Sequence, residues 1–103
     1  MKIFQKEETD YIEKWMGDLI SNEDMTPETK NRFKIITSYY GLKMRQLAES
    51  AKLTKIEVIA KFNILVKEQN KELKEVLPAE QFDSFSTFYD KLSWSVNKRL
   101  NQL

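Results

Sequence analysis

The segments Met25-Thr26-Pro27-Glu28-Thr29 and Leu77-Pro78-Ala79-Glu80-Gln81 decide the fold, because each opens a long amphipathic run. A proline costs little at the first helical position, since the N–H that it lacks would have no partner inside the helix. Glu28 and Glu80 follow at positions where the helix dipole is positive. The two segments therefore predict the starts of two helices, which we place at Pro27 and Pro78.

Between these two starts, apolar residues recur at steps of three and four, as along one face of an α-helix. They predict a second helix from 27 to 52 and a third that begins after Thr54, whose hydroxyl forms a capping box with Glu57. The heptad spacing of the third helix includes one polar residue, Gln69. The heptads are too few for a free-standing coiled coil, so we predict an antiparallel helical hairpin. The expected core positions of this hairpin are Phe33, Ile36, Tyr40, Leu47, Ile59, Phe62, Val66 and Leu73.

The same spacing predicts one helix on each side of the hairpin. The first extends from about Glu7 to Ile20. The fourth extends from Pro78, packs across the hairpin through Phe82 and Phe85, and frays beyond Asn97. Two glycines and two prolines leave little material for long loops. We therefore predict a single all-α domain, residues 1–103, of four helices in which the second and third form a long antiparallel hairpin.

Several classes of function are disfavoured by composition. The chain has no cysteine and no histidine, which removes disulfides, thiol catalysis and the common zinc sites. Its two glycines lie too far apart for a phosphate-binding loop. Carboxylates of the third helix alternate with lysines, as in solvated ion pairs. We expect no enzymatic activity and no cofactor or metal, and no apolar run approaches the roughly 20 residues that span a bilayer.

Charge is unevenly distributed along the chain. Residues 1–28 carry three lysines and eight acidic residues, whereas residues 29–103 carry fourteen basic and eight acidic residues. One explanation is that the acidic N-terminal segment packs on the basic remainder. The other is that a basic surface meets an acidic partner and the N-terminal segment modulates access to it.

The aromatic residues of the predicted fourth helix cover more than one face. They are either core alone, or core together with a dimer or client surface. These residues are Phe82, Phe85, Phe88, Tyr89 and Trp94.

The segment Leu47–Val58 also resembles a helix-turn-helix, with Val58 on the inner side of the second helix. Lys52 stands where such motifs usually have glycine, and Lys61 stands where another buried aliphatic residue is expected. One alternative function is therefore nucleic-acid binding through Lys55 and Lys61. A second alternative is an intracellular helical module that binds another protein.

With the helix starts placed, residues 19–93 resemble the Spy/CpxP family of periplasmic stress proteins. This family carries two copies of a Leu-Thr-x-x-Gln motif, each of which opens a helix. Here methionine stands for the first leucine, threonine for the first glutamine, and proline for the second threonine. The helix-start residues that carry the resemblance are Met25, Thr26, Pro27 and Glu28 in the first copy and Leu77, Pro78, Glu80 and Gln81 in the second.

The resemblance implies a non-enzymatic protein that acts as an ATP-independent chaperone or an envelope-stress adaptor. It also implies a cradle-shaped homodimer whose partners are unfolded protein clients or another protein. The family is exported, so we expect a periplasmic location if a signal peptide has been removed before Met1, and a cytoplasmic one otherwise. The motif residues themselves are capping elements and predict no contacts with a client.

Overall fold

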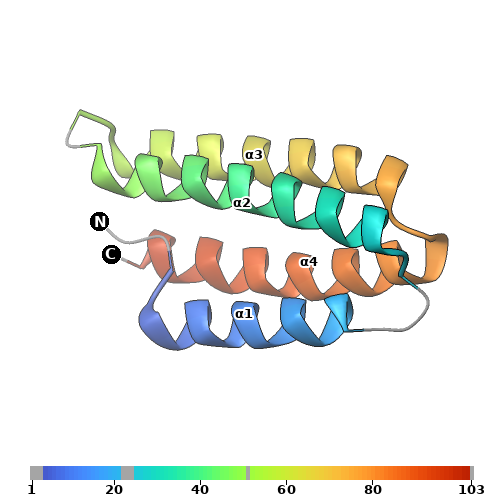
Figure 1. The fold of residues 1–103 in the computed structure, drawn as a ribbon. Helices are drawn as coiled ribbons and strands as arrows, with labels where there is room; N and C mark the ends of the chain where they lie inside the picture. The colour runs from blue at the N-terminus through green and yellow to red at the C-terminus, as the bar shows by residue number, and fades with distance from the viewer. Residues whose placement is uncertain (1–3, 22–24, 51, 103) are drawn as a thin grey trace.

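The computed structural model describes residues 4–21, 25–50 and 52–102, which form four helices and no strand (Figure 1). The predicted all-α fold is therefore confirmed. None of these helices combines the length and the apolar composition needed to cross a membrane. The helices run alternately up and down along a bundle 41 Å long. Their bounds are Lys6–Ile20 for α1, Pro27–Glu49 for α2, Lys55–Val76 for α3 and Ala79–Asn101 for α4.

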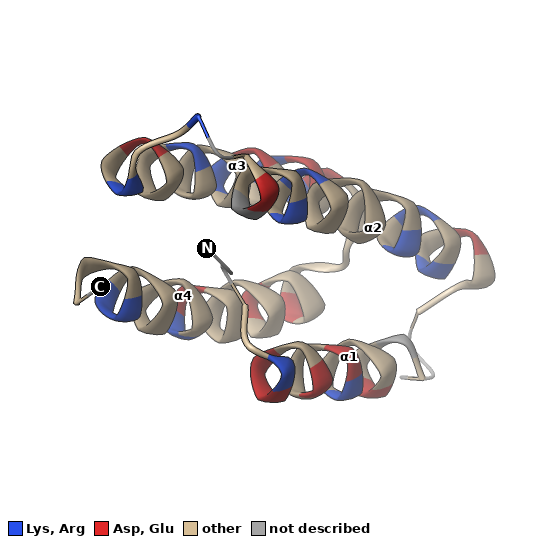
Figure 2. Ribbon diagram, turned by 90° about the vertical axis from the view of Figure 1, so that its left-hand side faces the viewer, with Lys and Arg blue, Asp and Glu red and all other residues tan. Residues whose placement is uncertain are grey.

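The helices form two layers, with α2 beside α3 in one and α1 beside α4 in the other (Figures 1 and 2). α2 and α3 pack along their length, so the predicted antiparallel hairpin is confirmed. α4 runs lengthwise beside α3 rather than across the hairpin. The amides of Asn63 on α3 and Asn97 on α4 exchange two hydrogen bonds of 3.0 and 2.9 Å, which fix the register of the two helices.

The core follows the predicted apolar stripe. Phe33, Tyr40, Phe62, Val66, Leu73 and Phe85 are buried, and Ile36, Leu47, Ile59 and Phe82 are partly buried against them. Fully buried side chains also come from Met44 on α2, Val58 on α3 and Val96 on α4. The stripe is continuous from helix to helix because each contributes residues at three- and four-residue steps.

Two helix ends differ from the expectation. α2 ends at Glu49 rather than at 52, because Ser50 leaves the helix with ψ 110° while its N–H still bonds to the Leu47 carbonyl; Ala51 lies outside the described residues. α4 remains helical to Asn101, so the expected fraying beyond Asn97 is wrong. The reason is that Leu100 is fully buried and anchors the last turn of α4.

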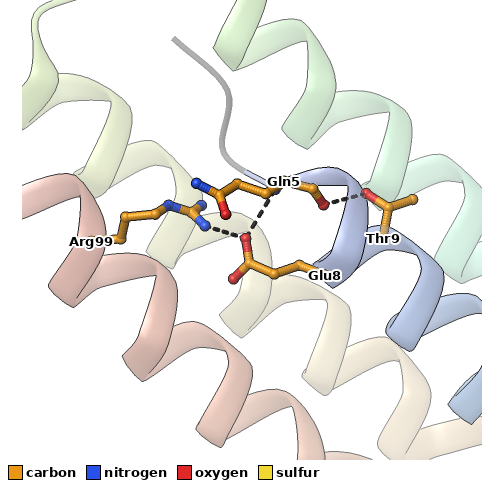
Figure 3. A network of polar contacts seen from close by, with 4 residues as sticks. All are labelled: Gln5, Glu8, Thr9 and Arg99. Atoms are coloured by element: carbon orange, nitrogen blue, oxygen red, sulfur yellow. Dashed lines mark hydrogen bonds and ion pairs between the residues drawn. The ribbon is translucent and has the colours of Figure 1, made fainter.

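α1 is held against α4 by aromatic rings and one ion pair. The Trp15 indole stacks on Phe88 with 4.2 Å between ring centroids, and Tyr11 lies 5.4 Å from the same ring. Glu8 accepts from Arg99 of α4 and from the backbone N–H of Gln5, 2.9 Å away (Figure 3). The acidic helix α1 therefore packs on α4, which carries three basic and three acidic residues, and the Glu8–Arg99 pair joins the two helices.

Candidate functional site

The two copies of the helix-start motif occupy equivalent positions in α2 and α4. Met25 and Leu77 directly precede the N-cap residues and are only 3% and 6% exposed, so each anchors its helix start in the core. Thr26 is the N-cap of α2 and accepts from the backbone N–H of Thr29 at 3.2 Å. Both starts lie at the same end of the bundle (Figure 1). The motif residues Met25, Thr26 and Leu77 therefore fix where α2 and α4 begin.

The prolines of the two copies differ in place by one residue. Pro27 is the first residue of α2, as expected, whereas Pro78 is the N-cap of α4, and the helix begins at Ala79. The expectation that α4 starts at Pro78 is therefore wrong by one position. Pro78 has no side-chain oxygen and makes no capping hydrogen bond. Glu28 and Glu80 both lie exposed in a first turn, and Gln81 is buried.

The segment that resembles a helix-turn-helix adopts a different arrangement. The two helices of such a motif cross at about 90–120°, but α2 and α3 lie antiparallel along their length. Val58 is buried, while Lys52 and Lys61 are exposed. The burial of Val58 is equally well explained by the core of the hairpin, so this arrangement gives the nucleic-acid alternative no support.

One face of α2 carries three large apolar side chains in solvent. Ile35, Tyr39 and Leu42 are 60%, 52% and 47% exposed. They recur at steps of four and three and therefore share one face, turned away from the core. We call these three residues the α2 stripe. Contiguous exposed apolar residues mark binding surfaces in soluble proteins more often than isolated ones do.

The α2 stripe lies on the most basic helix of the bundle. Residues 27–49 carry five basic and two acidic side chains, whereas residues 6–20 carry two basic and five acidic ones (Figure 2). The Lys43 ammonium lies 5.6 Å from the centre of the Tyr39 ring, within the range of a cation–π contact. The face therefore combines apolar contact area with positive charge.

The buried Tyr40 packs against Tyr39 of the α2 stripe and links α2 to α3. The Tyr39 ring packs edge-to-face on Tyr40, with centroids 5.0 Å apart. The Tyr40 hydroxyl donates to Glu72 of α3, which ties the two helices together. Burial first, and then this hydrogen bond, raise the pKa of Tyr40 above its ordinary value of 10.0. The hydroxyl therefore stays protonated and keeps donating at neutral pH.

The aromatic residues of the fourth helix suggest an interface there, whereas the α2 stripe is not among the surfaces expected from the sequence. On α4, Phe85, Phe88 and Tyr89 are buried, while Trp94 is 66% exposed with Lys98 over its ring, so that aromatic group is core plus a surface remainder. The α2 stripe had a recognisable signal. Ile35, Tyr39 and Leu42 also follow helical spacing, but on the face opposite the one that holds Phe33 and Tyr40.

In the part of the chain that the structure describes, no three acidic side chains converge as the ligands of a metal ion would. Comparisons of the chain with protein-family models, with curated proteins and with solved structures found no match.

Proposed function

We propose that this protein is a non-enzymatic binder of protein segments, which acts as an ATP-independent chaperone or stress adaptor of the Spy/CpxP kind. The α2 stripe is the observation that carries the proposal. Its three apolar side chains are about half exposed or more and follow one another along a single helix face. An extended or helical client segment could cover all three at once and bury their area from water.

Charge narrows the class of client. α2 carries five basic and two acidic side chains, and Lys43 lies against Tyr39 of the α2 stripe, so client segments that combine apolar residues with acidic flanks are favoured over basic ones. The hydrogen bond between Tyr40 and Glu72 holds the hairpin below this face in one arrangement. A preformed surface avoids the entropic cost of ordering itself on binding.

The resemblance of residues 19–93 to the Spy/CpxP family adds two elements to the proposal. It would place the protein in the periplasm, and it would make the protein a homodimer. Sedimentation velocity measures the second element directly, because a dimer has twice the mass of the 12.3 kDa chain. A monomer at every concentration used in the chaperone assay would remove the dimer from the proposal.

A chaperone assay on variants of one face tests the main proposal. We expect the wild-type protein to suppress light scattering by heat-unfolded citrate synthase at several-fold molar excess. Replacing Ile35, Tyr39 and Leu42 together by glutamine should abolish most of this effect while leaving the circular dichroism unchanged, because all three are exposed. The matched control is Trp94→Gln, which removes an equally exposed aromatic residue from α4 and should retain full activity.

Two results would overturn the proposal: no suppression by the wild-type protein, or equal losses in the triple variant and the control. The same samples test the nucleic-acid alternative. Binding of duplex DNA that weakens steeply with added salt would favour that alternative, because phosphate contacts release counterions.

A further inference from the structure

The seam between α1 and α2 is open, unlike the closely packed seams between α2 and α3 and between α3 and α4. A groove with a volume of about 780 Å³ runs along it, which falls within the about 300–1,000 Å³ typical of small-molecule sites. Most of its lining is apolar, and α3 and α4 supply the floor. Its lining includes Ile12 and Met16 from α1, Thr37 and Gly41 from α2, Gln69 from α3 and Tyr89 from α4.

The side-chain amide of Gln69, at the floor of the groove, has an N–H donor that makes no hydrogen bond of normal geometry to any of the described residues. Gln69 is 1% exposed, so this donor is buried. The neighbouring Tyr89 hydroxyl donates to the Met44 sulfur at 3.2 Å, and a thioether is a weak acceptor. The Gln69 amide is close enough to this hydroxyl to lower its pKa, but the two groups do not reach the geometry of a hydrogen bond. A buried donor left unpaired is costly, so such a group at a groove floor points to an acceptor that arrives with a ligand. The terminal torsion of glutamine is soft enough for the amide to turn towards it.

The rim of the groove carries charges of both signs. Asp10 and Glu13 lie on the α1 wall, Arg45 and Glu49 on the α2 wall, and Lys6 at the start of α1. An ion of either sign would meet like charges as well as opposite ones here, so the rim gives neither sign a clear advantage. An uncharged ligand meets no such conflict.

The wall at Gly41 gives the groove its width. A Cβ atom built at Gly41 would have no neighbouring atom within 4 Å, so a side chain there would project into open space in the groove. Gly17 on α1 has equally open surroundings, but it does not line the groove. The two glycines therefore form a matched pair, one inside the groove and one outside it.

We propose that the α1–α2 groove binds an uncharged, mostly apolar small molecule that carries an acceptor oxygen, which receives a hydrogen bond from Gln69 Nε2. The apolar body lies along Ile12 and Met16, and the oxygen reaches the floor. This site is separate from the α2 stripe, none of whose residues lines the groove. It therefore stands or falls independently of the proposed chaperone function.

The neutral aromatic ketone Prodan is a suitable probe, because its emission shifts to shorter wavelength in apolar surroundings. We expect saturable binding to the full chain with such a shift. Gly41→Leu should abolish it by filling the groove, whereas Gly17→Leu should bind as the wild type does. Both substitutions replace a helical glycine by a strong helix former, so neither is expected to unfold the protein.

The hydrogen bond is tested by comparing Prodan with its counterpart that has a propyl group in place of the ketone. Gln69→Leu should reduce the preference for the ketone by about 2- to 10-fold, the worth of one net hydrogen bond. The proposal is overturned if Prodan does not saturate, if Gly41→Leu binds it unchanged, or if Gln69→Leu keeps the full preference. It is also overturned if the triple glutamine variant of the α2 stripe loses Prodan binding, because the dye would then be reporting that face.

Discussion

The Trp15 ring of α1 lies flat on the Phe88 ring of α4, with 4.2 Å between centroids and 4° between planes. This stack joins the first helix to the last and is one of the apolar contacts that hold α1 in place, beside those of Ile12, Met16 and Leu19 with the core. Because Phe88 in turn packs edge-on to Tyr89 in the core, the position of α1 is coupled to the centre of the bundle.

Removing the stack should loosen α1. We expect Trp15→Ala to lower the free energy of unfolding by about 2–4 kcal/mol, since it removes a partly buried ring and an aromatic pair. Urea denaturation measures the loss, and hydrogen exchange should show faster exchange in α1 than in α3. The control is Trp94→Ala, an exposed position where we expect a change within about 0.5 kcal/mol. Equal effects of the two substitutions would show that the stack does not hold α1.

The ion pair between Glu8 and Arg99 should contribute less than the stack. Both side chains are about one-fifth exposed, so a double-mutant cycle with alanine at each position should give a coupling of about 0.5–1 kcal/mol. The cycle also subtracts the capping contact of Glu8 with Gln5, which Glu8→Ala removes as well. The coupling should shrink as salt is added. A coupling of zero at low salt would place the whole attachment of α1 on its aromatic residues.

The capping box at the start of α3 should be visible in an acid titration. Hydrogen bonds from the Thr54 backbone and then the Thr54 side chain lower the pKa of Glu57 below its ordinary value of 4.5. The charged form stabilises the helix start above pH 4.5, and this contribution is lost as the pH falls through the lowered pKa. NMR titration of the Glu57 carboxyl should give a pKa below 4.5. Thr54→Ala removes the side-chain hydrogen bond and keeps the backbone one, so the pKa should move only part of the way up towards the ordinary value. An unchanged pKa would contradict the side-chain contact.

Burial of Tyr89 should make the fold sensitive to alkali. Burial raises the pKa of Tyr89 to about 12, against a smaller opposing effect of Gln69. The unfolded chain loses this proton near pH 10 and the folded chain keeps it, so stability falls as the pH rises from 10 to 12. The total loss from this group is about 2–3 kcal/mol. Tyr89→Phe should lose less stability than the wild type over that interval in urea denaturation, and parallel losses would contradict the assignment.

In the absence of a ligand, the buried amide of Gln69 should lower the free energy of unfolding. Gln69→Leu removes a buried donor without a proper partner and keeps a similar volume, so we expect unfolding to require about 1–2 kcal/mol more. The thermal midpoint of the variant measures this change. A lower midpoint than that of the wild type would mean that the Gln69 amide is satisfied inside the protein.

The local features of the fold could be predicted from the sequence because their causes are local. The hydroxyls of Thr26 and Thr54 cap their helices within three residues, and the apolar steps of Phe33, Tyr40 and Phe62 depend only on helical spacing. The predictions were wrong where contacts between residues far apart in the sequence determine where a helix ends. Burial of Leu100 extends α4, which no capping pattern in the last residues indicates.

The surfaces were harder to predict because they depend on which helix face is left uncovered. Gln69 stood out as the polar member of a heptad, but its place on a groove floor follows only once α1 and α2 are positioned. Gly41 lines the groove, and its position in the sequence alone does not indicate this. The α2 stripe became a candidate only when the core side of α2 was known.

The most direct measurement of the central claim is an NMR titration of the isotope-labelled protein with β-casein, an acidic and disordered polypeptide. The account predicts that the amide signals that shift or broaden cluster around Ile35, Tyr39 and Leu42, and that the triple glutamine variant shows no such change. Signals that change only around Trp94 on α4, or none that change at all, would contradict it.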